Sequence, residues 1–370
     1  MKILAAVAAQ QQKPLDVRML ELDEPERDEV RVKIIATGIC RTDLDVRDGY
    51  LPTPLPIVLG HEGAGIVEKV GTAVTRLRVG DHVVLSIGRC GVCGPCNQGQ
   101  PAFCMQHMKL NFGGSRLDGS TCLHDGSTSV YSHFFCQSSH ATYAVAHQSS
   151  LVKVPKDVDL KFLGPLACGV MTGAGGVLNS LKPAASDSIA IFGAGTVGLS
   201  ALMAVNILGC ERCIVVDNKR SRLELAKELG ATHTVLSESG VDVAKQIREF
   251  TDGLGVHCAF ESSGVRSVIS TAFSSLRELG TLVMTGVLPQ GTTLEFDAWS
   301  LLRGRKIIGS VMGDTDPHFF IPKLVEFYRQ GRLPLEKISK VYPLKSINDA
   351  IDDSSSGRVV KPIIFMPHGV

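Results

Sequence analysis

The stretch Ser188-Ile-Ala-Ile-Phe-Gly-Ala-Gly-Thr-Val-Gly198 decides the fold of the second half of the chain. An apolar run is followed directly by three glycines in a Gly-x-Gly-x-x-Gly spacing, and a helical pattern begins at Thr196. In this context Gly193 permits a tight turn, Gly195 lets the backbone approach a pyrophosphate, and Gly198 lets strand and helix pack closely. The N-terminus of the helix then offers N–H groups and a positive dipole end to phosphates. The stretch therefore predicts a dinucleotide-binding site.

Outward from this stretch, apolar strands alternate with helical patterns between about Pro183 and Val311. Six strands joined by helical crossovers predict an α/β fold with a doubly wound, parallel Rossmann sheet. The predicted strands are residues 188–192, 213–217, 234–236, 256–260, 281–287 and 306–311. The predicted helices are residues 196–208, 220–229, 242–250 and a fourth that continues to Leu279.

Asp217 ends the second predicted strand, nineteen residues after Gly198. A carboxylate at this position would accept hydrogen bonds from the adenosine ribose and repel a 2′-phosphate, which favours NAD over NADP. Lys219, Arg220 and Arg222 follow closely and weaken that preference, and we include Arg222 among the candidate cofactor-binding residues.

The first half of the chain has a different sequence pattern, in which short predicted strands are separated by Gly and Pro. This pattern predicts a β-rich domain, for which a compact barrel is one expected form. The clearest strands are residues 30–35, 65–70 and 81–85, and residues 105–137 predict a long ordered loop. A helix over residues 321–330 and a strand over residues 363–365 follow the Rossmann pattern.

The bulk composition excludes several classes of partner. The 370 residues exceed the usual size of a single core, which predicts two domains. Because 38 Lys and Arg nearly balance 37 Asp and Glu, we expect neither nucleic acid nor a membrane surface as a partner. Residues 1–9 predict a first β-strand rather than a signal peptide, since their apolar run is short and no clear cleavage pattern follows. We therefore expect a cytoplasmic protein.

Four of the eleven cysteines lie within fifteen residues, in the spacing Cys90-x2-Cys93-x2-Cys96-x7-Cys104. Each two-residue gap lets two sulfurs converge on one ion, and four thiolates without an open position describe a structural zinc site. An iron–sulfur cluster is the alternative, because thiolates serve both. A second pair, Cys210 and Cys213, has no partner pair nearby, and we interpret it as core or surface rather than as a redox site.

Three scattered segments carry a further signature. They are Gly60-His61-Glu62-x2-Gly65-x5-Gly71-x2-Val74, the isolated Cys40, and Gly164-Pro-Leu-Ala-Cys-Gly-Val-Met-Thr-Gly173. With these residues the chain resembles the zinc-dependent alcohol dehydrogenases of the medium-chain dehydrogenase/reductase superfamily over essentially its whole length. The Gly-Pro-Leu-x-Cys-Gly segment and Gln137-Ser-Ser139 with Ala141-Thr-Tyr143 are most similar to the aryl (benzyl) alcohol dehydrogenases.

The resemblance implies a GroES-like catalytic zinc domain formed by residues 1–169 and 312–370, and a Rossmann NAD-binding domain formed by residues 170–311. It also implies that Cys40, His61 and Cys168 bind a catalytic zinc and leave its fourth position open, which suits a Lewis acid. Glu62 would stand behind this metal. Asp43 would accept a hydrogen bond from the far ring nitrogen of His61. Thr42 would accept the proton of the alcohol.

By the same resemblance, Arg41 and Lys361 would approach the pyrophosphate, and Thr172 and Val287 would lie near the nicotinamide. Ser86 or Ile87 and Phe112 would lie near the substrate pocket. We interpret His107, His124, His133, His140 and Cys136 as structural or pocket-lining residues rather than metal ligands. Many relatives carry a histidine at the position of Asp45, where it ends a proton relay. Asp45 either takes over that role as a base or faces solvent.

The expected function is that of an NAD-dependent alcohol dehydrogenase with two Zn²⁺ per chain. It would interconvert a primary alcohol, aryl or allylic by preference, and its aldehyde by hydride transfer. The alternative enzyme is an S-(hydroxymethyl)glutathione (formaldehyde) dehydrogenase, which shares both zinc sites. A non-enzymatic nucleotide-binding protein is disfavoured because all three ligands of the catalytic zinc are present. The resemblance also implies a homodimer or homotetramer.

Overall fold

The computed structural model describes residues 1–368, which divide into two compact units. One unit comprises Met1–Cys168 and the chain from Thr315 onward, and the other comprises Gly169–Asp314. These limits lie within three residues of the boundaries expected from the sequence. No helix in the described part of the chain is long and apolar enough to cross a membrane.

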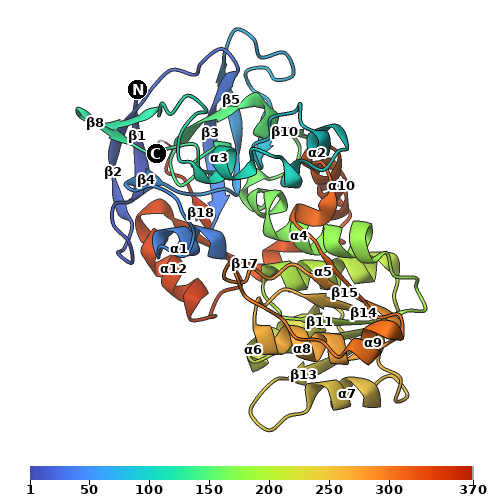
Figure 1. Ribbon diagram of the computed structural model, residues 1–370. Coiled ribbons are helices and arrows are strands. Elements are labelled where there is room, and N and C mark those ends of the chain that lie inside the picture. Colours follow the sequence, from blue (N-terminus) through green and yellow to red (C-terminus); the bar gives the residue numbers. More distant parts are fainter. Residues whose placement is uncertain (369–370) are drawn as a thin grey trace. The chain divides into compact units, whose positions relative to one another are not determined.

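The second unit contains a parallel sheet with the strand order β13-β12-β11-β14-β15-β16, which confirms the predicted doubly wound fold (Figure 1). All residues of the strand at its centre are buried, as expected where helices cover both faces. The last two strands end two or three residues earlier than predicted. The strands are β11 (Ser188–Phe192), β12 (Arg212–Asp217), β13 (His233–Leu236), β14 (Val256–Glu261), β15 (Leu276–Met284) and β16 (Lys306–Gly309).

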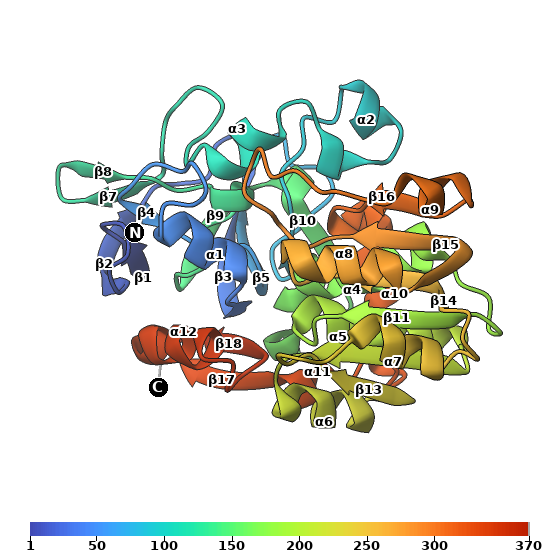
Figure 2. The ribbon, with the colours of Figure 1, turned by 60° about the horizontal axis from the view of Figure 1, so that its bottom comes forward.

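Helices cover this sheet on both faces (Figure 2). They are α4 (Gly169–Gly175), α5 (Thr196–Leu208), α6 (Arg220–Glu228), α7 (Val243–Glu249), α8 (Arg266–Ser274) and α9 (Ala298–Leu302). Ala190 and Phe192 of β11 share a core with residues of α7 and α8. Because side chains alternate along a strand, Ile189 and Ile191 point to the opposite face, and α5 packs there against β11. The helix α5 ends at Gly209, whose φ of +73° is the usual geometry of a helix C-terminus.

The predicted helix that continues to Leu279 is wrong. The helix α8 ends at Ser274, and Leu276 already pairs with Val256 in the sheet. The following Arg, Glu and Leu favour a helix locally, but pairing with β14 outweighs that weak preference. An irregular register between Val256 and Cys258 accommodates the extra residues.

The strands of the first unit form two sheets rather than one closed barrel. One sheet has the order β4-β1-β2-β7-β8, and β1 lies where the first strand was predicted. The other has the order β10-β6-β5-β3-β18-β17, with β9 also paired to β3. The strands are β1 (Lys2–Ala8), β2 (Asp16–Leu22), β3 (Glu29–Gly38), β4 (Ile57–Val58), β5 (Gly63–Val70), β6 (His82–Leu85), β7 (Leu123–Asp125), β8 (Thr128–Val130), β9 (Tyr143–His147), β10 (Leu151–Val154), β17 (Ser339–Pro343) and β18 (Lys361–Phe365).

Short helices connect these sheets. They are α1 (Arg41–Arg47), α2 (Gly94–Asn97), α3 (His107–Phe112), α10 (Pro317–Arg329), α11 (Leu335–Ile338) and α12 (Ile347–Ser355). Residues 105–137 therefore hold a helix and a hairpin, α3 and β7–β8, and the expectation of one long loop is corrected. The strand β7 of this hairpin pairs with β2 and so extends the sheet. Because this pairing joins distant parts of the chain, a local sequence pattern does not reveal it.

A buried ionic cluster ties this segment to the start of β3. Glu29 is 5% exposed and accepts hydrogen bonds from Arg116 at 2.8 and 2.9 Å, and it lies 3.1 Å from Nε2 of His133. Burial by itself would raise the pKa of Glu29, but the bonds to His133 and Arg116 lower it well below its usual value. The ionised carboxylate therefore stabilises the folded state.

We predict that Glu29→Gln lowers the stability of the chain at neutral pH by about 2–4 kcal/mol, because it removes the buried charge partner of Arg116 and leaves only the more exposed Glu26 at 3.4 Å. A carboxyl group whose folded-state pKa is depressed stabilises above its unfolded pKa of about 4.3 and loses that effect as pH falls. Because this loss begins only below about pH 4, the difference between the two proteins should be clearly smaller at about pH 2.5 than at pH 7. Thermal unfolding midpoints at both pH values measure it, and an equal difference at both would contradict the ionic explanation.

Candidate active site

Three sulfur and nitrogen atoms from distant parts of the first unit converge on one point. Cys40 lies between β3 and α1, His61 lies in the turn before β5, and Cys168 follows a short helix, η5 (Gly164–Ala167). Cys40 Sγ and Cys168 Sγ are 3.8 Å apart, and Cys168 Sγ is 3.3 Å from His61 Nε2. One oxygen of Glu62 lies within 4.8 Å of these atoms. The predicted ligands are thus brought together.

This arrangement fits a zinc ion with an open coordination position. Two thiolates at about 2.3 Å from a tetrahedral Zn²⁺ would be roughly 3.8 Å apart, as the two sulfurs are. A hydrogen bond from Cys168 lowers the pKa of Cys40 well below its usual value, and His61 and Lys361 act in the same direction while burial opposes it. The site therefore already favours one thiolate, the form that a metal needs.

Asp43 holds the imidazole of His61 in place. Its Oδ1 lies 2.9 Å from His61 Nδ1 and accepts from Gly60 N at 3.1 Å, while its Oδ2 accepts from Cys40 N at 2.8 Å. Burial raises the pKa of Asp43, but the charges of His61 and His140 and the hydrogen bonds from His61 and Cys40 N together lower it to about 2. An ionised carboxylate on Nδ1 keeps a proton there, so that Nε2 is the nitrogen left to bind a metal beside the two sulfurs.

Lys361 lies directly behind the metal ligands of the first unit. Its ammonium donates to both oxygens of Glu62 and to the carbonyl of Ile39, each at 2.9 Å. It is only 2% exposed, and burial lowers its pKa less than Glu62 and Cys40 raise it. All three ammonium protons are therefore engaged behind the metal ligands, and the expected contact with a pyrophosphate stays a prediction.

The helix α1 begins directly at the site. Thr42 Oγ1 lies 3.9 Å from Cys40 Sγ, so its hydroxyl is next to a ligand atom. Arg41 is 72% exposed at its side chain, and its Nε donates to Asp45 Oδ1 at 2.8 Å. Asp45 is 18% exposed at its side chain and is paired with Arg41, so the expectation that it faces open solvent is wrong. The alternative, that Asp45 acts as a base in a proton relay, stays a prediction.

An aromatic group lies beside His61, and sequence reasoning found only part of it. The rings of Phe134 and Phe135 contact the imidazole, and Phe112, which was expected near the pocket, contacts both phenylalanines. Ser86 donates to the carbonyl of Ala167, next to Cys168. No local pattern marks Phe134 and Phe135, although the neighbouring Gln137-Ser-Ser139 drew attention to this segment.

The histidines within residues 105–140 contact protein side chains and backbone rather than forming a metal site. None belongs to a group with metal-ligand geometry within residues 1–368. His107 contacts Asn111, His124 contacts Asp23, His133 contacts Glu29, and His140 is buried against Gly60. The free thiol of Cys136 is buried as well, and burial raises its pKa to about 12.

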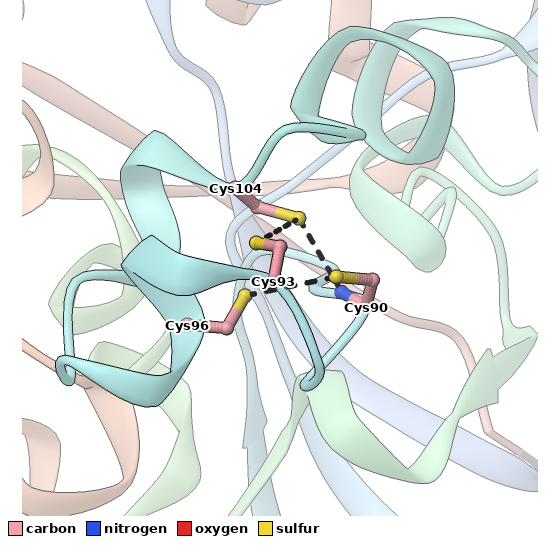
Figure 3. Close-up of side chains that lie close together, drawn as sticks. All are labelled: Cys90, Cys93, Cys96 and Cys104. Carbon is pink, nitrogen blue, oxygen red and sulfur yellow. Dashed lines mark hydrogen bonds between the residues drawn. The ribbon is translucent and has the colours of Figure 1, made fainter.

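The four clustered cysteines point toward one another from a lobe around α2 (Figure 3). Their sulfurs lie within 4.8 Å of one another, with Cys90 and Cys96 at 4.0 Å and Cys93 and Cys104 at 3.9 Å. Backbone N–H groups of Met105 and Cys96 lower the pKa of Cys93 to about 6. Four sulfurs with tetrahedral spacing and no oxygen or nitrogen fit a closed metal site. Cys210 and Cys213 form no such group; both are free and buried.

The second unit carries the features of a nucleotide site. Gly193 has a φ of +94°, as a tight turn between β11 and α5 requires. A cavity of about 270 Å³ opens beside it and is lined by Asp217, Val243, Ser263 and Val265 among others. The Asp217 carboxylate accepts from the backbone N–H groups of Ala194 at 2.7 Å and Lys219 at 2.9 Å, which holds it at the cavity.

The remaining cofactor candidates also lie in this unit. Arg222 is half-buried on α6, and burial lowers its pKa. Thr172 lies on α4 with its hydroxyl 3.9 Å from the sulfur of Met312. Val287 follows β15, and its side chain is 70% exposed. The charge of Asp217 acts on Arg222, and the roles of all three residues toward a cofactor stay predictions.

The metal ligands and the nucleotide site together define a zinc-dependent dehydrogenase. The chain matches the model of the alcohol dehydrogenase GroES-like domain over residues 26–156 and that of the zinc-binding dehydrogenases over residues 196–328. It belongs to the zinc-dependent alcohol dehydrogenases of the medium-chain dehydrogenase/reductase superfamily.

Three relatives cover nearly the whole chain. Geraniol dehydrogenase of Castellaniella defragrans is 41% identical over 97% of this chain and 96% of its own. The crystal structure of benzyl alcohol dehydrogenase from Acinetobacter calcoaceticus is 46% identical, with a TM-score of 0.95 over 99% of this chain and all of its own. That of an alcohol dehydrogenase zinc-binding domain protein from Burkholderia ambifaria is 49% identical, with a TM-score of 0.97 over both whole chains.

Gly195 and Gly198 of the Gly-x-Gly-x-x-Gly stretch should respond differently to substitution by alanine. A Cβ on Gly198 would lie 1.7 Å from the carbonyl oxygen of Gly193, whereas a Cβ on Gly195 would meet no atom within 4 Å. We predict that Gly198→Ala lowers the thermal unfolding midpoint. Gly195→Ala should keep the midpoint but weaken NAD binding at least tenfold, because its methyl fills space that the pyrophosphate needs. Calorimetry with NAD measures both, and unchanged affinity in Gly195→Ala would contradict the assignment.

Proposed function

We propose that this protein is an NAD-dependent zinc alcohol dehydrogenase that interconverts a primary aryl or allylic alcohol and its aldehyde. The convergence of two sulfurs and one nitrogen from Cys40, His61 and Cys168, with an oxygen of Glu62 beside them, carries the proposal. The names of two relatives support the substrate class, since geraniol is allylic and benzyl alcohol is aryl. Both alcohols carry the hydroxyl on a carbon next to a π-system.

The chemistry divides between the bound groups and the chain. These ligands would hold a Zn²⁺, which would supply Lewis acidity that lowers the pKa of the alcohol hydroxyl, and a bound NAD would supply the acceptor for the hydride from its carbon. Thr42, from its position beside Cys40, would accept a hydrogen bond from the alcohol hydroxyl and, as it takes up that proton, pass its own hydroxyl proton outward to solvent. Asp43 keeps the proton of His61 on Nδ1, and Lys361 balances the charge of Glu62 behind the site.

The second metal site and the cofactor follow the same reasoning. Cys90, Cys93, Cys96 and Cys104 would hold a structural zinc, and the family's zinc binding favours this metal over an iron–sulfur cluster. Asp217 at the cavity favours NAD, because its negative charge opposes a 2′-phosphate. We also propose a cytoplasmic homodimer or homotetramer, as the resemblance implies.

The first test removes a metal ligand. Cys168→Ala should lower kcat for benzyl alcohol or geraniol by about 10³-fold, because the Lewis acid contributes several kcal/mol to the barrier. Its zinc content should fall from two to one per chain. Cys122→Ala, the same change at a buried cysteine of the same unit, serves as the control and should keep both zincs. Unchanged turnover in Cys168→Ala, or wild-type protein without zinc, would overturn the proposal.

The second test concerns the cofactor. Asp217→Asn keeps the size of the side chain and an oxygen for Ala194 N–H but removes the charge. We predict that the ratio of kcat/KM for NAD to that for NADP falls roughly ten- to a hundredfold, since like-charge repulsion toward a 2′-phosphate is lost. Steady-state kinetics with both cofactors measure the ratio. A ratio that stays the same would mean that Asp217 does not discriminate.

A further inference from the structure

The segment His133–His140 runs along the turn that carries His61, and we call it the strap. Four of its residues that are not glycine have a positive φ: His133 at +60°, Phe135 at +51°, Cys136 at +56° and Ser138 at +53°. Side chains rarely adopt this region of backbone space, and a run of such residues persists only where surrounding contacts hold it. The contacts of the strap therefore show what this backbone geometry maintains.

Backbone contacts fix the strap against the residues that precede His61. Ser139 N donates to the carbonyl of Gly60 and His140 N to that of Leu59, both at 2.9 Å. The hydroxyl of Ser138 donates to the carbonyl of Val58 at 2.5 Å. The strap is thus hydrogen-bonded to each of the three residues, 58 to 60, that precede the metal ligand His61.

Gln137 continues this contact across His61 itself. Its Nε2 donates to the carbonyl of His61 at 3.0 Å and to that of Ser86 at 3.3 Å, and its Oε1 accepts from Gly63 N at 3.1 Å. The side chain is 1% exposed, so no water replaces these bonds. One amide therefore holds the backbone at His61 and two residues beyond it, and anchors both to the end of β6.

Phe135 supports the ring of the same histidine. Its ring stacks on the imidazole with centroids 4.5 Å apart and planes at 26°, and Phe134 meets the imidazole edge-on at 5.6 Å. Asp43 bonds only the Nδ1 edge of the imidazole. A face contact and an edge bond together restrict the ring in tilt and in rotation, which one contact alone does not.

We propose that the strap positions His61 for the metal, with Gln137 and Phe135 as its positioning residues. Gln137 fixes where the backbone of His61 lies, and Phe135 fixes how its ring is tilted. Nε2 is thereby held toward Cys168 Sγ without a rearrangement when zinc binds. This inference rests on the proposed function, because it concerns the catalytic zinc of that function.

Gln137→Leu tests the backbone clamp, and Gln148→Leu is its control. Gln148 is half-buried in the same unit and makes the same kind of bonds, from Thr75 N and to Ala73 O, away from the site. We expect Gln137→Leu to weaken zinc at the Cys40 site by about 10- to 100-fold in a chelator competition, the range for residues that support metal ligands. Zinc at Cys90–Cys104 should not change, and Gln148→Leu should keep both metals.

Phe135→Leu gives a second test that removes no hydrogen bond, and Phe112→Leu is its control, because Phe112 contacts Phe134 and Phe135 but not the imidazole. With Co²⁺ at the Cys40 site, Phe135→Leu should shift the visible absorption of the metal and weaken binding about 2- to 10-fold. Phe112→Leu should leave the spectrum unchanged.

The outcomes separate this inference from the proposed function. If the wild type binds zinc at both sites but Gln137→Leu and Phe135→Leu hold it within twofold of their controls, with unaltered Co²⁺ spectra, the inference is overturned and the proposed function stands. If the variants lose both metals equally, the strap acts only on stability and the inference is also overturned. A wild type without zinc at Cys40, His61 and Cys168 overturns both.

Discussion

The geometry of the metal ligands depends on one buried carboxylate. Asp43 accepts hydrogen bonds from the backbone of Cys40, from the backbone of Gly60 and from the ring of His61. Two segments that each carry a ligand are therefore tied to the same side chain, and α1 begins where the first ligand lies. Because the carboxylate is 1% exposed, all three bonds form away from water, where charged hydrogen bonds are strong and their loss is costly.

The same desolvation demands that other charges at the site be balanced. Glu62 is fully buried next to two thiols, and an isolated carboxylate there would be strongly disfavoured. Lys361 supplies the opposite charge from β18, far away in sequence, and its ammonium has no proton left for another partner. The pair explains why a lysine can be buried behind the metal ligands. The buried carboxylate of Glu62 therefore accounts for the buried ammonium group of Lys361.

The elements that could be predicted best from the sequence are those whose limits depend on short-range sequence patterns. The strand Ser188–Phe192 and the helix Thr196–Leu208 have the predicted limits, because an apolar run, three glycines and a terminal Gly209 are local signals. The predicted helix to Leu279 failed because pairing with Val256 decides the structure there. The Cys40 ligand set came from resemblance, since no spacing links residues 40, 61 and 168. The strap and the Glu62–Lys361 pair were beyond reach for the same reason, the latter joining residues 299 apart.

The two cysteine-containing sites differ in what holds them together. Cys90 to Cys104 lie in one lobe, so a bound metal closes only short loops, which costs little chain entropy. The Cys40 site draws ligands from segments up to 128 residues apart, so its geometry exists only where β3, the Gly60 turn and η5 already pack correctly. A site of this kind needs supporting contacts from several directions, and the structure supplies them through Asp43, Lys361 and Gln137. Precision at the open metal site thus comes from the fold around it, whereas the closed site carries its own geometry in its spacing.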